Sequence, residues 1–130
     1  MGLILDTNFV IAAEREARRG SPGRTDAFLA SRTSENVFLT FTVAGELACG
    51  QSANVRRDWE RLCRPFPILP WTMEIAWYYG ETYRVLAAAG KLIGANDLWI
   101  AATALAHDHG VVTNNLEEFR RVPGLVVETF

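Results

Sequence analysis

The sequence predicts an α/β fold built around a parallel β-sheet, and three observations lead to this prediction. Short apolar runs of strand-forming residues alternate along the chain with longer segments of helical periodicity. Glycine or proline marks several of the junctions between them. The 130 residues contain no repeat, no low-complexity segment and no linker long enough to divide them. We therefore expect a single domain over residues 1–130.

The first half of the chain is expected to hold three strands with helices between them. Residues 2–5, with the sequence GLIL, form an apolar run typical of a buried parallel strand. A helix is expected directly afterwards, over residues 7–16, with Thr7 or Asn8 able to cap its first turn. Beyond the loop RGSPGR, we expect helices over 25–32, 42–50 and 54–64 and strands over 36–41 and 65–71.

The second half continues the alternation. A long amphipathic pattern over residues 72–90 predicts a helix. A nearly all-apolar helix is expected over 95–110, where Gly110 would stop it. Strands are then expected over 111–115 and 125–130, separated by a helical turn over 116–122.

Composition and charge exclude some classes of protein. The longest apolar run, LWIAATALA, is far shorter than the roughly 18 residues of a membrane span. The first residues lack the basic stretch of a signal peptide, so we expect a cytoplasmic protein with no membrane partner. A net charge of −2 is not typical of a general nucleic-acid binder. The positive charge is nevertheless almost all arginine, which suits bidentate phosphate contacts.

Four carboxylates stand at unexpected positions. Asp6 ends the first predicted strand, and Asp97 lies in the first turn of an otherwise apolar helix. Glu46 falls on the apolar stripe of its predicted helix, and Glu118 follows the strand VVTNN by three residues. Each aspartate has a simpler interpretation as a helix cap, and Glu46 would be a surface residue if the helix phase were shifted by one.

Taken together, the acids indicate a divalent-metal site. Like charges gathered in one place repel each other, and a hard cation removes that cost. Mg²⁺ and Mn²⁺ prefer carboxylate and water oxygens, whereas no His or Cys here has the spacing of a zinc site. Ligands of parallel sheets sit beyond the carboxyl ends of the strands, where Asp6, Thr113 and Asn115 are expected.

Four blocks of the sequence resemble those of PIN-domain ribonucleases, and more narrowly the VapC-type toxins of bacterial toxin–antitoxin pairs. The blocks are ILDTNFVI, AGELACG, GANDLWIAATAL and VVTNNLEEFRRVPGL, in that order over essentially the whole chain. The resemblance implies a three-layer α/β/α sandwich whose central parallel sheet has the strand order 3-2-1-4-5. It also implies an acidic site for Mg²⁺ or Mn²⁺ in which Asp6, Glu46 and Asp97 match the catalytic, metal-binding acids.

The fourth acidic position departs from the family pattern. Some members carry an acid two residues after the threonine, where this chain has Asn115. Relatives with asparagine there often have an aspartate just before the phenylalanine, where this chain has Glu118. Glu118 is therefore a further candidate metal ligand. The supporting polar residues of the expected site are Thr7, Asn8, Thr113 and Asn115.

The resemblance further implies a metal-dependent endoribonuclease that cleaves RNA, in single-stranded or loop regions, by metal-activated water. It implies a cognate VapB-type antitoxin, and a homodimer to which the aromatic helix over residues 72–90 contributes. The main alternative is a PIN fold that binds RNA or a partner through a weakened metal site without cutting. A receiver domain would need a second acid beside Asp6, and a HAD-type phosphatase would need an acid at Asn8.

Overall fold

A computed structural model describes residues 1–130, apart from the side chain at position 52. Its centre is a five-stranded sheet in the order β3-β2-β1-β4-β5, and every pair of neighbouring strands is parallel. The strands are β1 (Leu3–Leu5), β2 (Val37–Thr40), β3 (Ile68–Leu69), β4 (Gly110–Val112) and β5 (Val127–Glu128). The predicted parallel sheet and its strand order are therefore confirmed.

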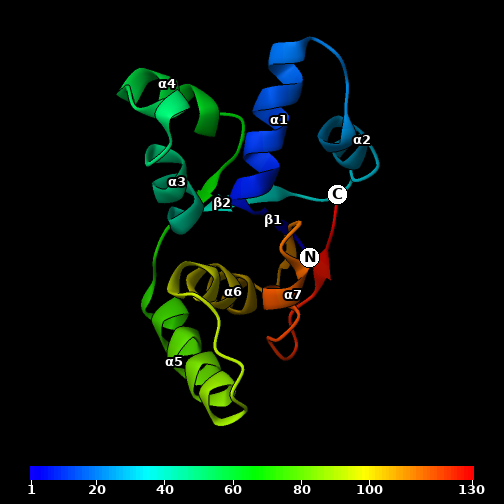
Figure 1. Ribbon diagram of the computed structural model, residues 1–130. Helices are drawn as coiled ribbons and strands as arrows, with labels where there is room; N and C mark the ends of the chain where they lie inside the picture. Colours follow the sequence, from blue (N-terminus) through cyan, green and yellow to red (C-terminus); the bar gives the residue numbers. More distant parts are fainter.

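Helices cover both faces of this sheet. They are α1 (Thr7–Arg19), α2 (Arg24–Ala30), α3 (Phe41–Ala48), α4 (Arg56–Cys63), α5 (Met73–Ala88), α6 (Ala95–His107) and α7 (Leu116–Phe119), with the 3₁₀ turn η1 (Gln51–Ala53) between α3 and α4. In Figure 1, α1, α2 and α4 lie on one side of the strands, and α5, α6 and α7 lie on the other. This is the three-layer arrangement that the resemblance implies.

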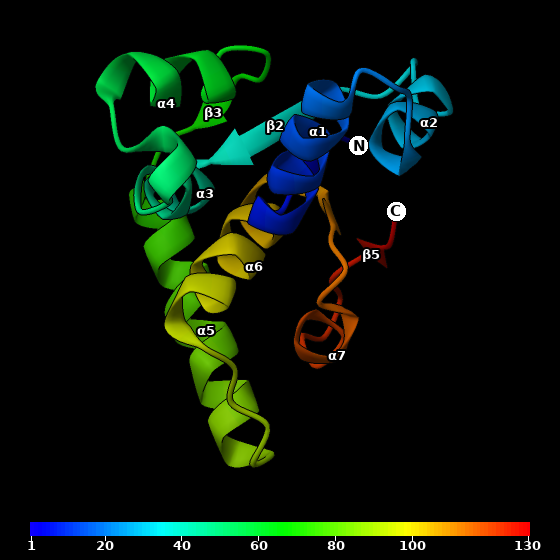
Figure 2. The ribbon, with the colours of Figure 1, turned by 45° about the horizontal axis from the view of Figure 1, so that its top comes forward.

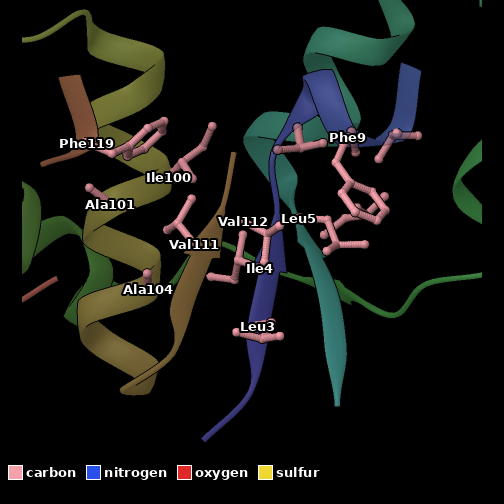
Figure 3. Packing of buried hydrophobic residues seen from close by; sticks show 14 of the residues in the cluster. Leu3, Ile4, Leu5, Phe9, Ile100, Ala101, Ala104, Val111, Val112 and Phe119 are labelled. Atoms are coloured by element: carbon pink, nitrogen blue, oxygen red, sulfur yellow. The ribbon is translucent and has the colours of Figure 1, made fainter. Parts of the chain in front are cut away.

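The central strand β1 is buried on both faces. Its residues Leu3, Ile4 and Leu5 are fully inaccessible to solvent, which explains why its sequence is continuously apolar rather than alternating. Figure 3 shows side chains of α6 and α7, among them Ile100, packed on one side of the sheet and Phe9 of α1 on the other. The first turn of α1 is thus anchored directly where β1 ends.

At the start of α1 the structure selects one of the caps that the sequence offered, and at the end of α6 the prediction is wrong. Asp6, rather than Thr7 or Asn8, caps α1: its side chain accepts a hydrogen bond from the backbone N–H of Thr7. At the other end of the domain, α6 ends at His107, because Asp108 adopts the left-handed conformation with φ 55°. Gly110 does not stop the helix but opens β4 beside Leu3.

In the part of the chain that the structure describes, no helix is long and apolar enough to cross a membrane.

His109 joins the start of β1 to its neighbour β2. The backbone N–H of Gly2 donates to Nδ1 of His109 at 3.0 Å, and the imidazole stacks on Phe38 with 5.1 Å between ring centroids. Burial is the main reason that the pKa of His109 is lowered, and the charge of His107 adds to the effect. The neutral imidazole is therefore the form that the fold favours.

We expect His109 to make the domain less stable in mild acid. The unfolded chain binds a proton near pH 6.5, above the folded pKa, so the stability that His109 contributes is present above that pH. It is lost as the pH falls through the folded pKa. His109→Phe should cost about 1 kcal/mol at pH 7 through the lost hydrogen bond, but lose less stability than the wild type on going to pH 5. Urea unfolding of the wild type and the variant at both pH values measures this; parallel pH profiles would refute it.

Candidate active site

Asp6 is held at the junction of β1 and α1. Its side chain is only 5% exposed and takes hydrogen bonds from two directions. The backbone N–H of Thr7 donates to Oδ1 at 2.8 Å, and the hydroxyl of Thr113, just beyond β4, donates to Oδ2 at 2.7 Å. Burial raises the pKa of Asp6, the negative charge of Glu46 raises it further, and the two hydrogen bonds oppose that rise. The carboxylate is thus oriented by both central strands.

Glu46 reaches the same place from α3. The hydroxyl of Thr7 donates to Oε1 of Glu46 at 2.7 Å, and the amide of Asn96 at the start of α6 donates to Oε2 at 3.4 Å. Thr7 therefore touches two acids, with its backbone on Asp6 and its side chain on Glu46. The predicted helix phase is correct, because Val43 and Leu47 of the same stripe are buried in the core.

Asp97 and Glu118 form a hydrogen-bonded pair of acids. Burial is the largest cause that raises the pKa of Asp97 to about 8, followed by the hydrogen bond to Glu118 and by the negative charges of Asp6, Glu118 and Glu46. The same hydrogen bond is the main reason that the pKa of Glu118 is lowered. The amide of Asn115 also donates to Oδ2 of Asp97 at 3.1 Å. Near neutral pH this pair of acids therefore keeps one proton between them.

Asn8 links Asp6 and Thr113 to Asn114, which in turn contacts Thr129 after β5. Its amide donates to Oδ2 of Asp6 and to the hydroxyl of Thr113, both at 3.3 Å, and its Oδ1 accepts the backbone N–H of Asn114 at 3.3 Å. The hydroxyl of Thr129 donates in turn to the side-chain oxygen of Asn114 at 2.8 Å. Nothing in the local sequence around Thr129 indicates that it reaches the site, because the pairing of β5 with β4 brings it there.

All eight residues predicted for the site lie along one rim, at the carboxyl ends of β1 and β4. They are Asp6, Thr7, Asn8, Glu46, Asp97, Thr113, Asn115 and Glu118. Asn96, which was not among the predicted site residues, joins them through Glu46. Within the described residues, no three His, Cys, Asp or Glu side chains converge closely enough to enclose a metal ion.

The donor set nevertheless fits a hard cation. The rim brings together the carboxylates of Asp6, Glu46, Asp97 and Glu118, and the neutral groups hydrogen-bonded to them are hydroxyls and amides. Burial and the negative charges of its acidic neighbours raise the pKa of Asp97 well above its ordinary value. The carboxylates of the rim therefore repel one another. A divalent cation among oxygen ligands would remove that repulsion. The role of each acid as a metal ligand stays a prediction.

The family of this chain follows from the fold and the sequence together. A parallel sheet in the order 3-2-1-4-5 carries an acidic rim where its central strands end. The family model of the PIN domain matches residues 3–125. The chain belongs to the PIN-domain family, as the resemblance of its four sequence blocks indicated.

Within the PIN-domain family, the chain is similar to relatives and solved structures of the VapC proteins. The chain is 31% identical over 138 residues to ribonuclease VapC1 of Rickettsia felis, covering 99% of this chain and 96% of the relative. It is likewise 31% identical to ribonuclease VapC of Rickettsia bellii, with the same coverage. VapBC-1 from nontypeable Haemophilus influenzae superimposes with a TM-score of 0.80 at 28% identity, over 99% of this chain and 98% of that one. VapBC2 of Rickettsia felis, solved with a promoter DNA fragment, has a TM-score of 0.82 at 24% identity and shows the shared fold.

Proposed function

We propose that this protein is a divalent-metal-dependent endoribonuclease, the toxin of a VapBC-type toxin–antitoxin pair. The observation that carries the proposal is the rim of four mutually interacting carboxylates, with Asp6 buried beside Glu46 and Asp97 sharing a proton with Glu118. The full-length similarity to proteins named ribonuclease VapC supports RNA as the substrate.

Asp6, Asp97 and Glu46 would hold Mg²⁺ or Mn²⁺, with Glu118 as an additional ligand. The ion would supply a water of lowered pKa and positive charge against the scissile phosphate. On the protein side, Thr113 keeps one oxygen of Asp6 fixed, and Asn115 orients Asp97. Because hydrogen bonds to Thr7 and Asn96 already position the Glu46 carboxylate, a remaining lone pair is free to accept the proton of the attacking water.

The proposed partners are single-stranded or loop RNA, a VapB-type antitoxin and a second copy of the chain. The antitoxin follows from the relatives that were solved as VapBC complexes. The outer face of α5 supports the homodimer, because Met73 is 75% exposed and Trp77 is 60% exposed there. Large apolar side chains in that position are typical of surfaces that another chain covers.

One observation favours the alternative of an RNA-binding PIN domain that does not cut. The fourth acidic position offers no unengaged carboxylate, because Asn115 is neutral and the carboxylate of Glu118 is hydrogen-bonded to Asp97. A binding module would keep its affinity for RNA but show no cleavage in any metal.

A cleavage assay on the purified protein tests the proposed function. Labelled RNA should remain intact in EDTA and be cut after addition of Mn²⁺ or Mg²⁺. Attack by water does not use the 2′-hydroxyl as nucleophile, so the products should lack a 2′,3′-cyclic phosphate. This readout also separates the activity from contaminating nucleases that need no metal. Intact RNA in every metal, with binding preserved, would establish the alternative.

The fourth position should give a graded response. We expect Glu118→Gln to reduce activity only partly, since Mg²⁺ keeps much of its hydration shell and can be held there by water and substrate phosphate. Asn115→Asp should tighten metal binding in the absence of RNA by adding a charge next to Asp97. Calorimetric titration with Mn²⁺ checks both variants. A loss in Glu118→Gln as large as in Asp97→Asn would make Glu118 a direct ligand and overturn this ranking.

A further inference from the structure

A groove with a net positive charge lies between the end of α5 and the residues of and after α7, the helix that also carries Glu118 of the acidic rim. It has a volume of about 440 Å³ and is lined by Gly90, Lys91, Glu117, Arg120 and Arg121. We call these five residues the basic groove. Lys91 is the only lysine of the chain, and three cations face a single acid here.

The cations of the basic groove are less neutralised than those of the groove between α1 and α4. That second groove, of about 490 Å³, contains Arg18 and Arg61, and each of them is paired with an acid of the same groove. In the basic groove only Arg121 has such a partner, with 3.5 Å between its Nη2 and Oε1 of Glu117. Among the described residues, neither Lys91 nor Arg120 takes part in an ion pair.

The basic groove is fixed next to the acidic rim. Nη1 of Arg121 donates to the backbone carbonyl of Leu92 at 3.0 Å, which ties α7 to the segment that leads from α5 into α6. Five residues further along, Asp97 accepts the amide of Asn115, the residue that precedes α7. Helix α7 therefore carries Glu118 of the rim and Glu117 of the groove, and Arg120 and Arg121 follow it directly. Figure 2 shows α7 beside α6. The charge of Arg121 is close enough to contribute to the lowered pKa of Glu118.

The basic groove next to the acidic rim offers a way for the proposed ribonuclease to bind RNA despite its negative charge. RNA phosphates are repelled by a rim of carboxylates, and the net charge of −2 gives no general attraction. Affinity for a nucleic acid comes mainly from cations that contact its phosphates. Such cations have to lie within reach of the site, on the path of the strand that passes through it.

We infer that the basic groove binds the backbone phosphates of the RNA strand next to the scissile phosphate, with Lys91 and Arg120 as the contacting cations. The inference rests on the proposed ribonuclease function and adds a substrate-binding site to it. Arg121 holds the groove together through Leu92, whereas the side chains of Lys91 and Arg120 are exposed and free to meet phosphate. A strand lying there is held next to the acidic rim by charge rather than by base identity.

The test is the salt dependence of RNA binding. Affinity of the protein for a single-stranded RNA oligonucleotide is measured in EDTA, which prevents cleavage, between 50 and 200 mM KCl. Each phosphate contact to a single strand contributes about 0.7 to the slope of log affinity against log salt. The double variant Lys91→Gln/Arg120→Gln should therefore lose about 1.4 from that slope and bind about tenfold more weakly at low salt. The matched control is Arg57→Gln on α4, since Arg57 is exposed and has no ion pair among the described residues; it should change neither quantity by as much.

Cleavage in Mn²⁺ gives a second readout. The double variant should raise KM for the oligonucleotide with little change in kcat, and should cut a dinucleotide, too short to reach the groove, as well as the wild type does. Equal RNA affinity and equal salt slope in the wild type and the double variant would overturn the inference. It would also be overturned if polyglutamate displaced the bound oligonucleotide as effectively as unlabelled RNA does. If the wild type itself neither binds nor cuts RNA, the proposed function fails before the groove is tested.

Discussion

Replacing Asp6 with asparagine is expected to lower the rate of RNA cleavage about a thousandfold. Asparagine keeps the size of the side chain and an oxygen that can accept the hydrogen bond of Thr7, but it removes the charge that a metal ion needs. Metal-ion catalysis supplies several kcal/mol of transition-state stabilisation, which corresponds to a factor of that size. The measurement is single-turnover cleavage of labelled RNA in saturating Mn²⁺.

A matched control is available in Glu16, another buried acid of α1. Its carboxylate accepts the backbone N–H and the hydroxyl of Thr25, so it joins α1 to α2 away from the rim. Glu16→Gln should weaken the fold but leave cleavage per folded molecule close to that of the wild type. If Asp6→Asn cleaves at the wild-type rate, with contaminating nuclease excluded, the acidic rim is not the catalytic site.

Replacing Asp97 with asparagine should abolish cleavage and, in the same molecule, stabilise the metal-free protein by about 1–2 kcal/mol. Asparagine cannot ionise, yet its amide still donates to Glu118. In the wild type, the raised pKa of Asp97 means that the folded state holds a proton that the unfolded state releases. The stability that this group contributes is therefore complete below its ordinary pKa of about 3.8 and is lost as the pH rises towards about 8.

Thermal melts in EDTA at pH 5 and pH 8 measure this effect. The advantage of Asp97→Asn over the wild type should be larger at pH 8, where the wild-type acid is forced to ionise. Addition of Mn²⁺ should raise the melting temperature of the wild type more than that of the variant, since a ligand stabilises the native state that binds it. Equal metal-induced shifts in both proteins would count against a site at Asp97.

The centre of the fold was predictable from sequence because burial on two faces leaves a plain pattern. The run Leu3–Leu5 had to be a central strand, since no alternating face exists for solvent. The edge strands were harder: β3 and β5 each have two residues, although longer runs of strand-forming side chains surround them. Only one neighbour is available to an edge strand, so pairing rather than propensity decides its length.

The charged part of the site was predictable for a similar reason. An acid on an apolar stripe, such as Glu46, or at the end of a buried strand, such as Asp6, contradicts its local pattern. The neutral part was not. Asn96 and Thr129 are ordinary polar residues in their own segments, and each reaches the site only through the tertiary fold: Asn96 bonds a residue 50 positions away, and Thr129 one 15 positions away.

The position of β1 also has a consequence for when this protein becomes active during its synthesis. Strand β1 leaves the ribosome before β2 and β4, the two strands between which it must lie, and Asp6 finds its Thr113 partner 107 residues later. Contacts this distant in sequence form only after the intervening chain is available. A nascent chain stalled before residue 110 emerges should therefore show neither a protected sheet in pulse proteolysis nor cleavage of RNA. A toxin arranged in this way is inert toward its own messenger until β4 has been translated.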